Sequence, residues 1–216
     1  MPELSFEVVG AEVPPFAAVP ALNFKLCVVN ANAQERISTV MLRCQIQLAV
    51  TQRRYSPAAQ ARLLEVFGEP KRWGETLHNL LWTHVGIVVP RFSESITVDL
   101  PVPCTYDFEV VSTKYFDALE DGDIPLTFLF SGTIFYENKE GRVQVAQISW
   151  SQEASYRLPV ATWRAMIQRY YPNSAWLRLS KDVFDQLYTY KATHGFPTWE
   201  ETIVHLMQAS SEEAQR

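Results

Sequence analysis

The sequence predicts an α+β fold, in which an antiparallel β-sandwich or curved sheet carries a helical insertion and a C-terminal helical unit. Apolar and polar residues alternate with a period of two through most of residues 1–157, which is typical of strands with one wet face. From residue 158 to about 208 apolar residues recur at helical spacing instead. We therefore expect a β-rich domain over 1–157, a helical unit packed on the sheet over 158–208, and a frayed tail over 209–216.

Three strands are expected in the first 50 residues. Leu4, Phe6 and Val8 alternate in the first, and residues 22–28 form the second. In the third strand one set of side chains faces the core and the other faces water. The inward set is Val40, Leu42, Cys44, Ile46 and Leu48, and the outward set is Met41, Arg43, Gln45 and Gln47.

A helical insertion over about 56–83 interrupts the strands. Ser56 followed by Pro57 is typical of a helix start, with serine as the cap and proline at the first helical position. Gly68 and Pro70 would end this helix, and the Trp-rich run over 72–89 would return to a strand at 85–89.

The stretch from Leu100 to Tyr136 is expected to form two long strands joined by the acidic turn at 120–123. Tyr106, Phe108 and Val110 alternate with polar residues in the first of them, and apolar residues line one face of the second. A further strand is expected over 143–150.

Three helices are expected after residue 158. The first carries Trp163, Met166, Ile167 and Tyr170 on one face. Ser180 would cap the second helix and Gly195 would end it, and Thr198 with Glu201 fits a capping box for the third; these signals are typical of helix ends.

Composition argues against several classes of protein. The net charge of −5 and the pI near 5.4 disfavour a nucleic-acid binder, which needs a basic face. No segment approaches the roughly 20 apolar residues of a membrane-spanning helix, and no secretory signal is expected at the N-terminus. Cys27, Cys44 and Cys104 are odd in number and far apart, as in reduced cytoplasmic proteins.

The sequence contains no clear catalytic, metal-binding or phosphate-binding motif. His78 and His84 are spaced too far apart to share one helix face, so we expect no metal site, and the glycine spacing fits neither a P-loop nor a dinucleotide fold. Cys104 lies near Asp107, but a carboxylate raises the pKa of a neighbouring thiol, which favours a structural cysteine. We expect no cofactor and no enzymatic activity. If a polar pocket exists, Arg43, His84 and Asp107 are its candidate residues.

Aromatic residues near arginines are the remaining lead, because Trp, Tyr and Arg are enriched at the centres of protein–protein interfaces. An alternative is that the rings cap the edge of the sheet, with arginines stacked on them. The candidate partner-binding residues are Trp73, Trp82, Trp163, Arg164, Tyr171, Trp176 and Arg178.

Nearly the whole chain resembles a bacterial family of unknown function. The runs that carry the resemblance are MLRCQIQL, RRYS, LLEVFGE, RWGETL, LLWTH, LPVPCTYDFEV, FSGTIFY, EASYRLPVATWRAM and PTWE. Members of that family tend to be encoded in gene clusters of uptake nickel–iron hydrogenases. The resemblance implies an accessory role with a hydrogenase subunit or maturation factor as partner, and it implies no catalytic residue.

The C-terminal third also resembles the export chaperone SecB, in residues 158–161, 166–167, 171–172, 177–179 and 183–188. That resemblance implies a sheet followed by helices, a homo-oligomer and an apolar groove for unfolded clients. Three hypotheses follow: a non-enzymatic hydrogenase accessory protein, a SecB-like holdase, and a small-ligand carrier or enzyme.

Overall fold

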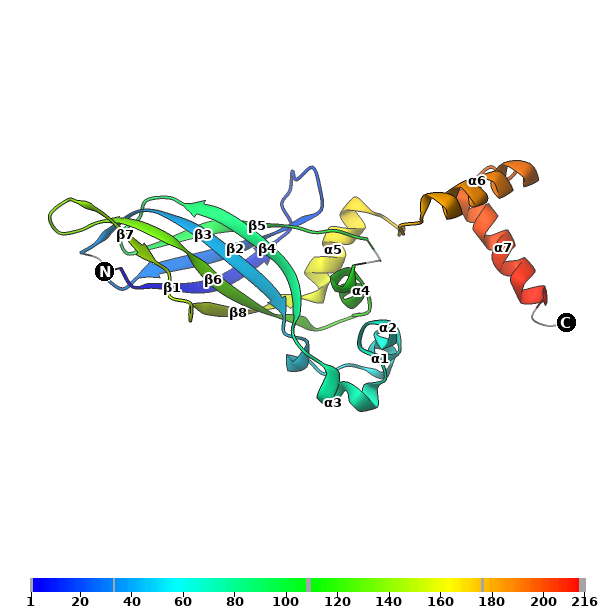
Figure 1. Ribbon diagram of the computed structural model, residues 1–216, viewed down its shortest axis with the longest axis horizontal. Helices are drawn as coiled ribbons and strands as arrows, with labels where there is room; N and C mark the ends of the chain where they lie inside the picture. The colour runs from blue at the N-terminus through cyan, green and yellow to red at the C-terminus, as the bar shows by residue number, and fades with distance from the viewer. Residues whose placement is uncertain (1, 33, 108–109, 176, 214–216) are drawn as a thin grey trace. The chain divides into compact units, whose positions relative to one another are not determined.

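The computed structural model describes residues 2–32, 34–107, 110–175 and 177–213 (Figure 1). The chain forms two compact units, which divide between residues 176 and 177. The first unit is an antiparallel sandwich of two sheets with short helices, and the second is a pair of helices. The predicted α+β class is confirmed.

The sandwich consists of a three-stranded sheet in the order β1-β2-β5 and a five-stranded sheet in the order β4-β3-β6-β7, with β8 also paired to β6. The strands of the described residues pair antiparallel throughout. The strands are β1 (Leu4–Glu12), β2 (Ala21–Asn30), β3 (Arg36–Leu48), β4 (Leu80–Val89), β5 (Ser95–Pro103), β6 (Asp123–Glu137), β7 (Val143–Gln147) and β8 (Glu153–Pro159).

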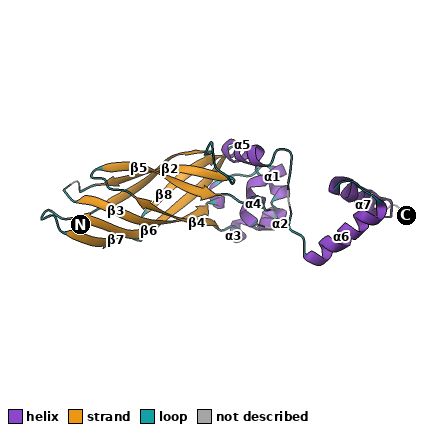
Figure 2. Cartoon of the chain, turned by 90° about the horizontal axis from the view of Figure 1, so that it is seen from above, coloured by secondary structure: helices purple, strands orange, loops and turns teal. Residues whose placement is uncertain are grey.

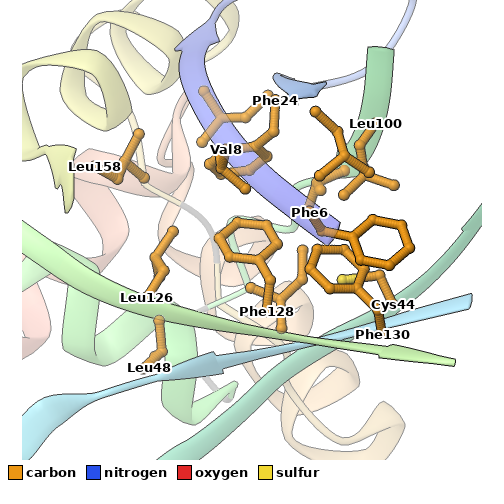
Figure 3. Packing of buried hydrophobic residues seen from close by; sticks show 14 of the residues in the cluster. Phe6, Val8, Phe24, Cys44, Leu48, Leu100, Leu126, Phe128, Phe130 and Leu158 are labelled. Carbon is orange, nitrogen blue, oxygen red and sulfur yellow. The ribbon is translucent and has the colours of Figure 1, made fainter. Parts of the chain in front are cut away.

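The core lies between the two sheets, and the alternation of the sequence places it there. On β3 the inward residues from Val40 to Leu48 are at most 2% exposed, as predicted. Phe6 of β1 stacks on Phe130 of β6 with ring centroids 4.4 Å apart, and Phe24 of β2 meets Phe128 edge-on at 5.1 Å (Figure 3). These rings join the sheets across the sandwich.

Gly132 of β6 lies opposite Leu42 of β3, where there is no space for a side chain. Its φ is +146°, and a Cβ atom there would lie 2.1 Å from the carbonyl oxygen of Met41. Beyond this point β6 exchanges partners, since its first half pairs with β8 and its second half with β7. Glycine is therefore required where the strand changes neighbours.

The short helices of the first unit gather at one end of the sheets (Figure 2). They are α1 (Pro57–Arg62), α2 (Leu64–Phe67), α3 (Trp73–Thr76), α4 (Val111–Asp117) and α5 (Val160–Tyr170), with single 3-10 turns η1 (Val50–Gln52) and η2 (Pro70–Arg72). The predicted cap of α1 is confirmed, because Ser56 Oγ accepts a hydrogen bond from the Ala59 N–H at 3.2 Å. The predicted apolar face of α5 is also confirmed, and it buries Trp163 and Met166.

The prediction of a strand around Tyr106 is wrong. β5 ends at Pro103, and the described residues after it lead into helix α4. Phe108 lies outside the described residues. The alternation stops because α4 buries neighbouring side chains on a helical face, with Tyr115 and Phe116 at most 1% exposed. The acidic turn therefore joins a helix to β6, and Arg53 holds it by donating to the carbonyls of Asp121 and Asp123, both at 2.6 Å.

Several boundaries differ from the expected ones. β4 starts at Leu80, inside the predicted insertion, and β7 ends at Gln147 because a turn follows it. α5 belongs to the first unit and its core, so the structure divides after residue 176 and not after 157. Residues 209–213, expected to be frayed, continue the last helix.

The second unit contains α6 (Lys181–His194) and α7 (Trp199–Glu213). All three predicted end signals are confirmed: Ser180 Oγ accepts from the Val183 N–H at 3.4 Å, Gly195 ends α6 in the left-handed conformation, and Thr198 Oγ1 accepts from the Glu201 N–H at 3.2 Å. Below, the segment 177–213 is called the helical hairpin.

Replacing Gly132 with alanine should destabilise the protein by about 3 kcal/mol or more, because the new methyl group meets backbone atoms that cannot move independently of the β3–β6 pairing. Gly74→Ala is the matched control, since nothing lies within 4 Å of its Cβ position in α3. Urea unfolding monitored by circular dichroism measures both free energies. Equal effects of the two substitutions would contradict the assigned role of Gly132.

Candidate functional site

The outer face of the five-stranded sheet contains a groove of about 690 Å³. Arg43 on β3 lies opposite Gly86 on β4 and Ser131 on β6, so two small residues flank its long side chain. In the next row His84, Gln45 and Leu129 are paired across the same three strands. Trp150, from the turn after β7, completes the lining. Below, this feature is called the sheet groove.

Two of the three predicted pocket residues, Arg43 and His84, meet in the sheet groove. Asp107 does not line it and lies between β5 and α4, where its N–H donates to Thr105 Oγ1 at 3.3 Å and its carbonyl accepts from the Val110 N–H at 3.0 Å. Among the described residues that line the groove, none is acidic. A guanidinium beside an exposed indole suits a carboxylate or an aromatic group of a bound molecule.

Trp150 was missed by the sequence analysis, which assigned it to the end of a strand. It lies instead in a turn between β7 and β8, in which the Gln152 N–H donates to the Ser149 carbonyl at 3.1 Å. The indole is 93% exposed. One sequence feature could have predicted this exposure. Trp150 lies between two serines at the point where the alternation of β7 ends, so no apolar neighbour in the sequence accompanies it into the core.

The predicted aromatic residues Trp82 and Trp163 lie together inside the first unit. A β-bulge makes this possible, since Ile46 pairs with Thr83 and Gln47 with Leu81, leaving Trp82 as the extra residue on β4. Its ring meets Phe116 at 5.0 Å and Trp163 at 6.4 Å. Trp163 is only 2% exposed.

Trp73 has a separate packing site between the inserted helices. Its ring meets Tyr55 at 5.3 Å and Phe67 at 5.5 Å, both edge-on. The indole Nε1–H donates to the Gly68 carbonyl at 2.9 Å, so the polar atom of the ring is satisfied. The hydroxyl of Tyr55 lies 3.1 Å from that of Tyr115, and burial raises the pKa of both tyrosines.

Arg164 and Tyr171 contact other residues of the first unit. Arg164 donates to the Leu119 carbonyl through Nε at 3.2 Å and Nη2 at 2.7 Å, and it lines a shallow cavity of about 510 Å³ beside Trp163. Tyr171 stacks on Tyr106 at 5.4 Å, and burial raises the pKa of the Tyr106 hydroxyl.

Among the described candidate partner-binding residues, Trp73, Trp82 and Trp163 therefore pack against other rings inside the first unit. Below, these rings are called the aromatic cap. Arg178 is exposed in the second unit, and Trp176 lies outside the described residues.

The helical hairpin presents apolar side chains instead of burying them. Among its described side chains only Thr202 is buried, although Phe184 meets Trp199 at 5.4 Å between the helices. Its exposed large apolar residues are Leu177, Leu179, Val183, Phe184, Tyr188, Ile203, Val204 and Met207.

Polar contacts hold the turn of the hairpin. The hydroxyl of Tyr190 lies 3.0 Å from His205 Nδ1, and His194 Nδ1 lies 2.9 Å from the Tyr190 carbonyl. Lys191 donates to the carbonyls of Phe196 and Pro197 at 2.8 and 3.0 Å. The Tyr190–His205 contact joins the two helices, and the bonds of Lys191 tie α6 to the connecting turn.

Cys44 and Cys104 are buried, as expected, whereas Cys27 is half-buried on β2, opposite Glu7 and Thr97. Cys104 Sγ donates to the Val102 carbonyl at 3.3 Å, and burial raises the pKa of the Cys44 and Cys104 thiols to about 12. Within the described part of the chain, no three His, Cys, Asp or Glu side chains lie close enough together to hold a metal ion. Over the same residues, no helix combines the length and apolarity needed to cross a membrane.

Comparison with known proteins places the chain in a family. The model of a family of unknown function, DUF6084, matches residues 1–215. The chain belongs to this family. No curated protein matches the chain.

Similar solved structures include a β-glucosidase from Kluyveromyces marxianus, at 8% identity and a TM-score of 0.24, where the match covers 72% of this chain and 15% of that one. β-Glucosidase 3B from Thermotoga neapolitana is similar at 10% identity and a TM-score of 0.25, over 72% of this chain and 17% of that one. The putative ApaA protein from Bordetella pertussis matches at 13% identity and a TM-score of 0.24, over 73% of this chain and 93% of that one.

Alanine substitution of two tryptophans should distinguish a core residue from a surface residue. Trp163→Ala should cost about 3–5 kcal/mol of unfolding free energy because it leaves a large cavity beside Phe116, whereas Trp150→Ala should change it by less than about 0.5 kcal/mol. Chemical unfolding of both variants measures this. A large loss in the Trp150 variant would show that this indole is structural.

Cys44 and Cys104 should resist thiol reagents in the native protein. At pH 8 a thiol with a pKa near 12 is ionised in only about one molecule in ten thousand, and only the thiolate reacts. Labelling with a disulfide reagent, followed by mass spectrometry of the peptides, should modify these two residues only after unfolding. Rapid native labelling of Cys104 would contradict the structural role.

Proposed function

We propose that this protein is a non-enzymatic accessory protein that binds another protein through the apolar face of the helical hairpin. The observation that carries the proposal is the exposure of that face: Met207 is 65%, Tyr188 59% and Val204 51% exposed. Exposed apolar patches are typical of interaction sites in soluble proteins.

The hairpin has the form of a recognition element. Both helices are amphipathic, with Asp and Lys on the polar side of α6 and Glu at the start of α7. An amphipathic helix pair places its apolar side chains in a groove of the partner, and such burial contributes roughly 25 cal/mol per Å² of apolar area. With almost nothing buried inside, the hairpin gains most of its stabilisation from the bound state.

The sheet groove supplies a second contact region for the same role. Trp150 and Arg43 are residue types that dominate interface energies, and both are exposed on an otherwise regular sheet face. In the proposed role, Trp150 and Arg43 would contact the partner together.

The identity of the partner is proposed from the sequence resemblance. Gene clusters of uptake nickel–iron hydrogenases support a hydrogenase subunit or a maturation factor as the bound protein, and assembly or function of that enzyme as the process assisted. A SecB-like holdase is the second candidate, since the same exposed side chains of the hairpin would suit unfolded clients.

Tagged protein purified from its native host should bring down a defined partner, and the double variant Tyr188→Asp with Met207→Asp should reduce its recovery at least about tenfold, because hot-spot residues contribute 2 kcal/mol or more. The matched control is Gln186→Asp with Gln208→Asp, which adds the same charge at exposed polar positions of the same helices.

Circular dichroism should show that both variants keep their helices. Hydrogenase proteins among the captured partners support the first candidate, whereas many unrelated unfolded chains support the holdase. Undiminished capture by the Tyr188 and Met207 variant would overturn the role of the hairpin.

A further inference from the structure

The edges of the sandwich are not equally protected. A free strand edge exposes unpaired backbone groups, and proteins usually guard it with charges, prolines, bulges or short length. β1 carries Glu7 and Glu12 and a bulge near Gly10, β5 carries Asp99 with Pro101 and Pro103, and β7 has five residues.

β4 lacks these guards along most of its free edge. From Thr83 to Val89 it has no Asp, Glu, Lys, Arg or proline, and its bulge lies earlier, at Trp82. β3 pairs with one side of β4, and among the described residues no strand pairs with the other side. Val88, on the outer face, is 68% exposed.

The core is open beside this edge. Val85 and Ile87 of β4 face inward but are only half-buried, although their neighbours on β3, Cys44 and Leu42, are at most 2% exposed. The facing edge, β5, repeats the pattern: Ile96 and Val98 are half-buried, whereas their partners on β2, Val28 and Leu26, are fully buried.

On the opposite side of the sandwich, the inward residues Leu4, Phe6 and Val8 of β1 are between 5% and 8% exposed, whereas Ala154 and Tyr156 of β8 are half-buried. On the β4 and β5 side, half-buried inward residues lie on both sheets. We call this side the open seam, formed by Val85, Ile87, Ile96 and Val98.

We infer that a second copy of this chain covers the open seam, with β4 of each copy paired antiparallel to β4 of the other across a two-fold axis. The two five-stranded sheets then form one continuous sheet. The N–H and C=O groups of β4 that point away from β3 gain partners, and the four seam residues of each copy are removed from water.

A folded copy fits the open seam better than an extended peptide. One added strand would cover Val85 and Ile87 but would leave Ile96 and Val98 on the other sheet exposed, whereas a second sandwich brings an edge of both sheets. Charge also permits self-pairing, because the segment from Thr83 to Val89 is neutral apart from His84 and places no like-charged pair of acids or bases opposite each other.

Val88→Lys in the full-length chain tests the inference. Lysine is the usual guard of a strand edge, and self-pairing of the segment from Thr83 to Val89 would place each lysine opposite His84 of the other copy. The wild-type protein should be a dimer in sedimentation velocity at micromolar concentration, and the variant should raise the dissociation constant at least about tenfold, because each copy adds a positive charge to the paired strands.

Val145→Lys is the matched control, because Val145 lies on the outer face of β7 and is 59% exposed. It should leave the dimer unchanged, and thermal unfolding should show that both variants stay folded. A monomeric wild type, or equal weakening by both substitutions, would overturn the inference. A dimer lost in the Tyr188→Asp, Met207→Asp variant but kept in Val88→Lys would assign self-association to the hairpin and would also overturn it; partner capture is measured separately.

Discussion

The pairing of β3 with β6 is the interaction on which the rest of the sandwich depends. It runs from Arg36 to Leu48 on β3, and it fixes which side chains of both strands face the core. β6 then holds β8 and β7 in succession on its other side. Because these pairings share one strand, the close approach at Gly132 sets the geometry of the whole five-stranded sheet, and a displacement there would propagate to every strand.

Aromatic packing extends this constraint to the helical end. The bulge at Trp82 turns one more ring inward than strict alternation allows, and that ring joins the core of the sandwich to α4 and α5 through Phe116 and Trp163. The short helices have few hydrogen bonds of their own, so this cluster and the bonds from Arg53 and Arg164 hold them in place. Residue types that dominate interfaces serve here as core.

Much of the fold could be predicted from sequence, because a two-residue period with one buried face leaves few alternatives in β1, β2 and β3, and because Ser56, Ser180 and Gly195 act locally at helix ends. The prediction failed near Tyr106, where a short alternating run is followed by a helix that tertiary packing decides. The site was less accessible. Arg43 and His84 meet through strand register, which spacing does not reveal, and composition alone cannot separate the buried Trp163 from the exposed Trp150.

The apolar surfaces that stay exposed follow from the way the strands and helices cover the core. β8 lies beside β1 on one side of the sandwich, and β4 lies beside β5 on the other side, where inward residues of both sheets stay half-buried. The helices of the first unit are used at one end, where the aromatic cap needs them, and the hairpin buries little within itself. Each uncovered apolar surface costs solvation free energy in the isolated chain, and any protein that covers it in the folded state stabilises that state in proportion to its occupancy. Stability and binding are thus linked at both surfaces.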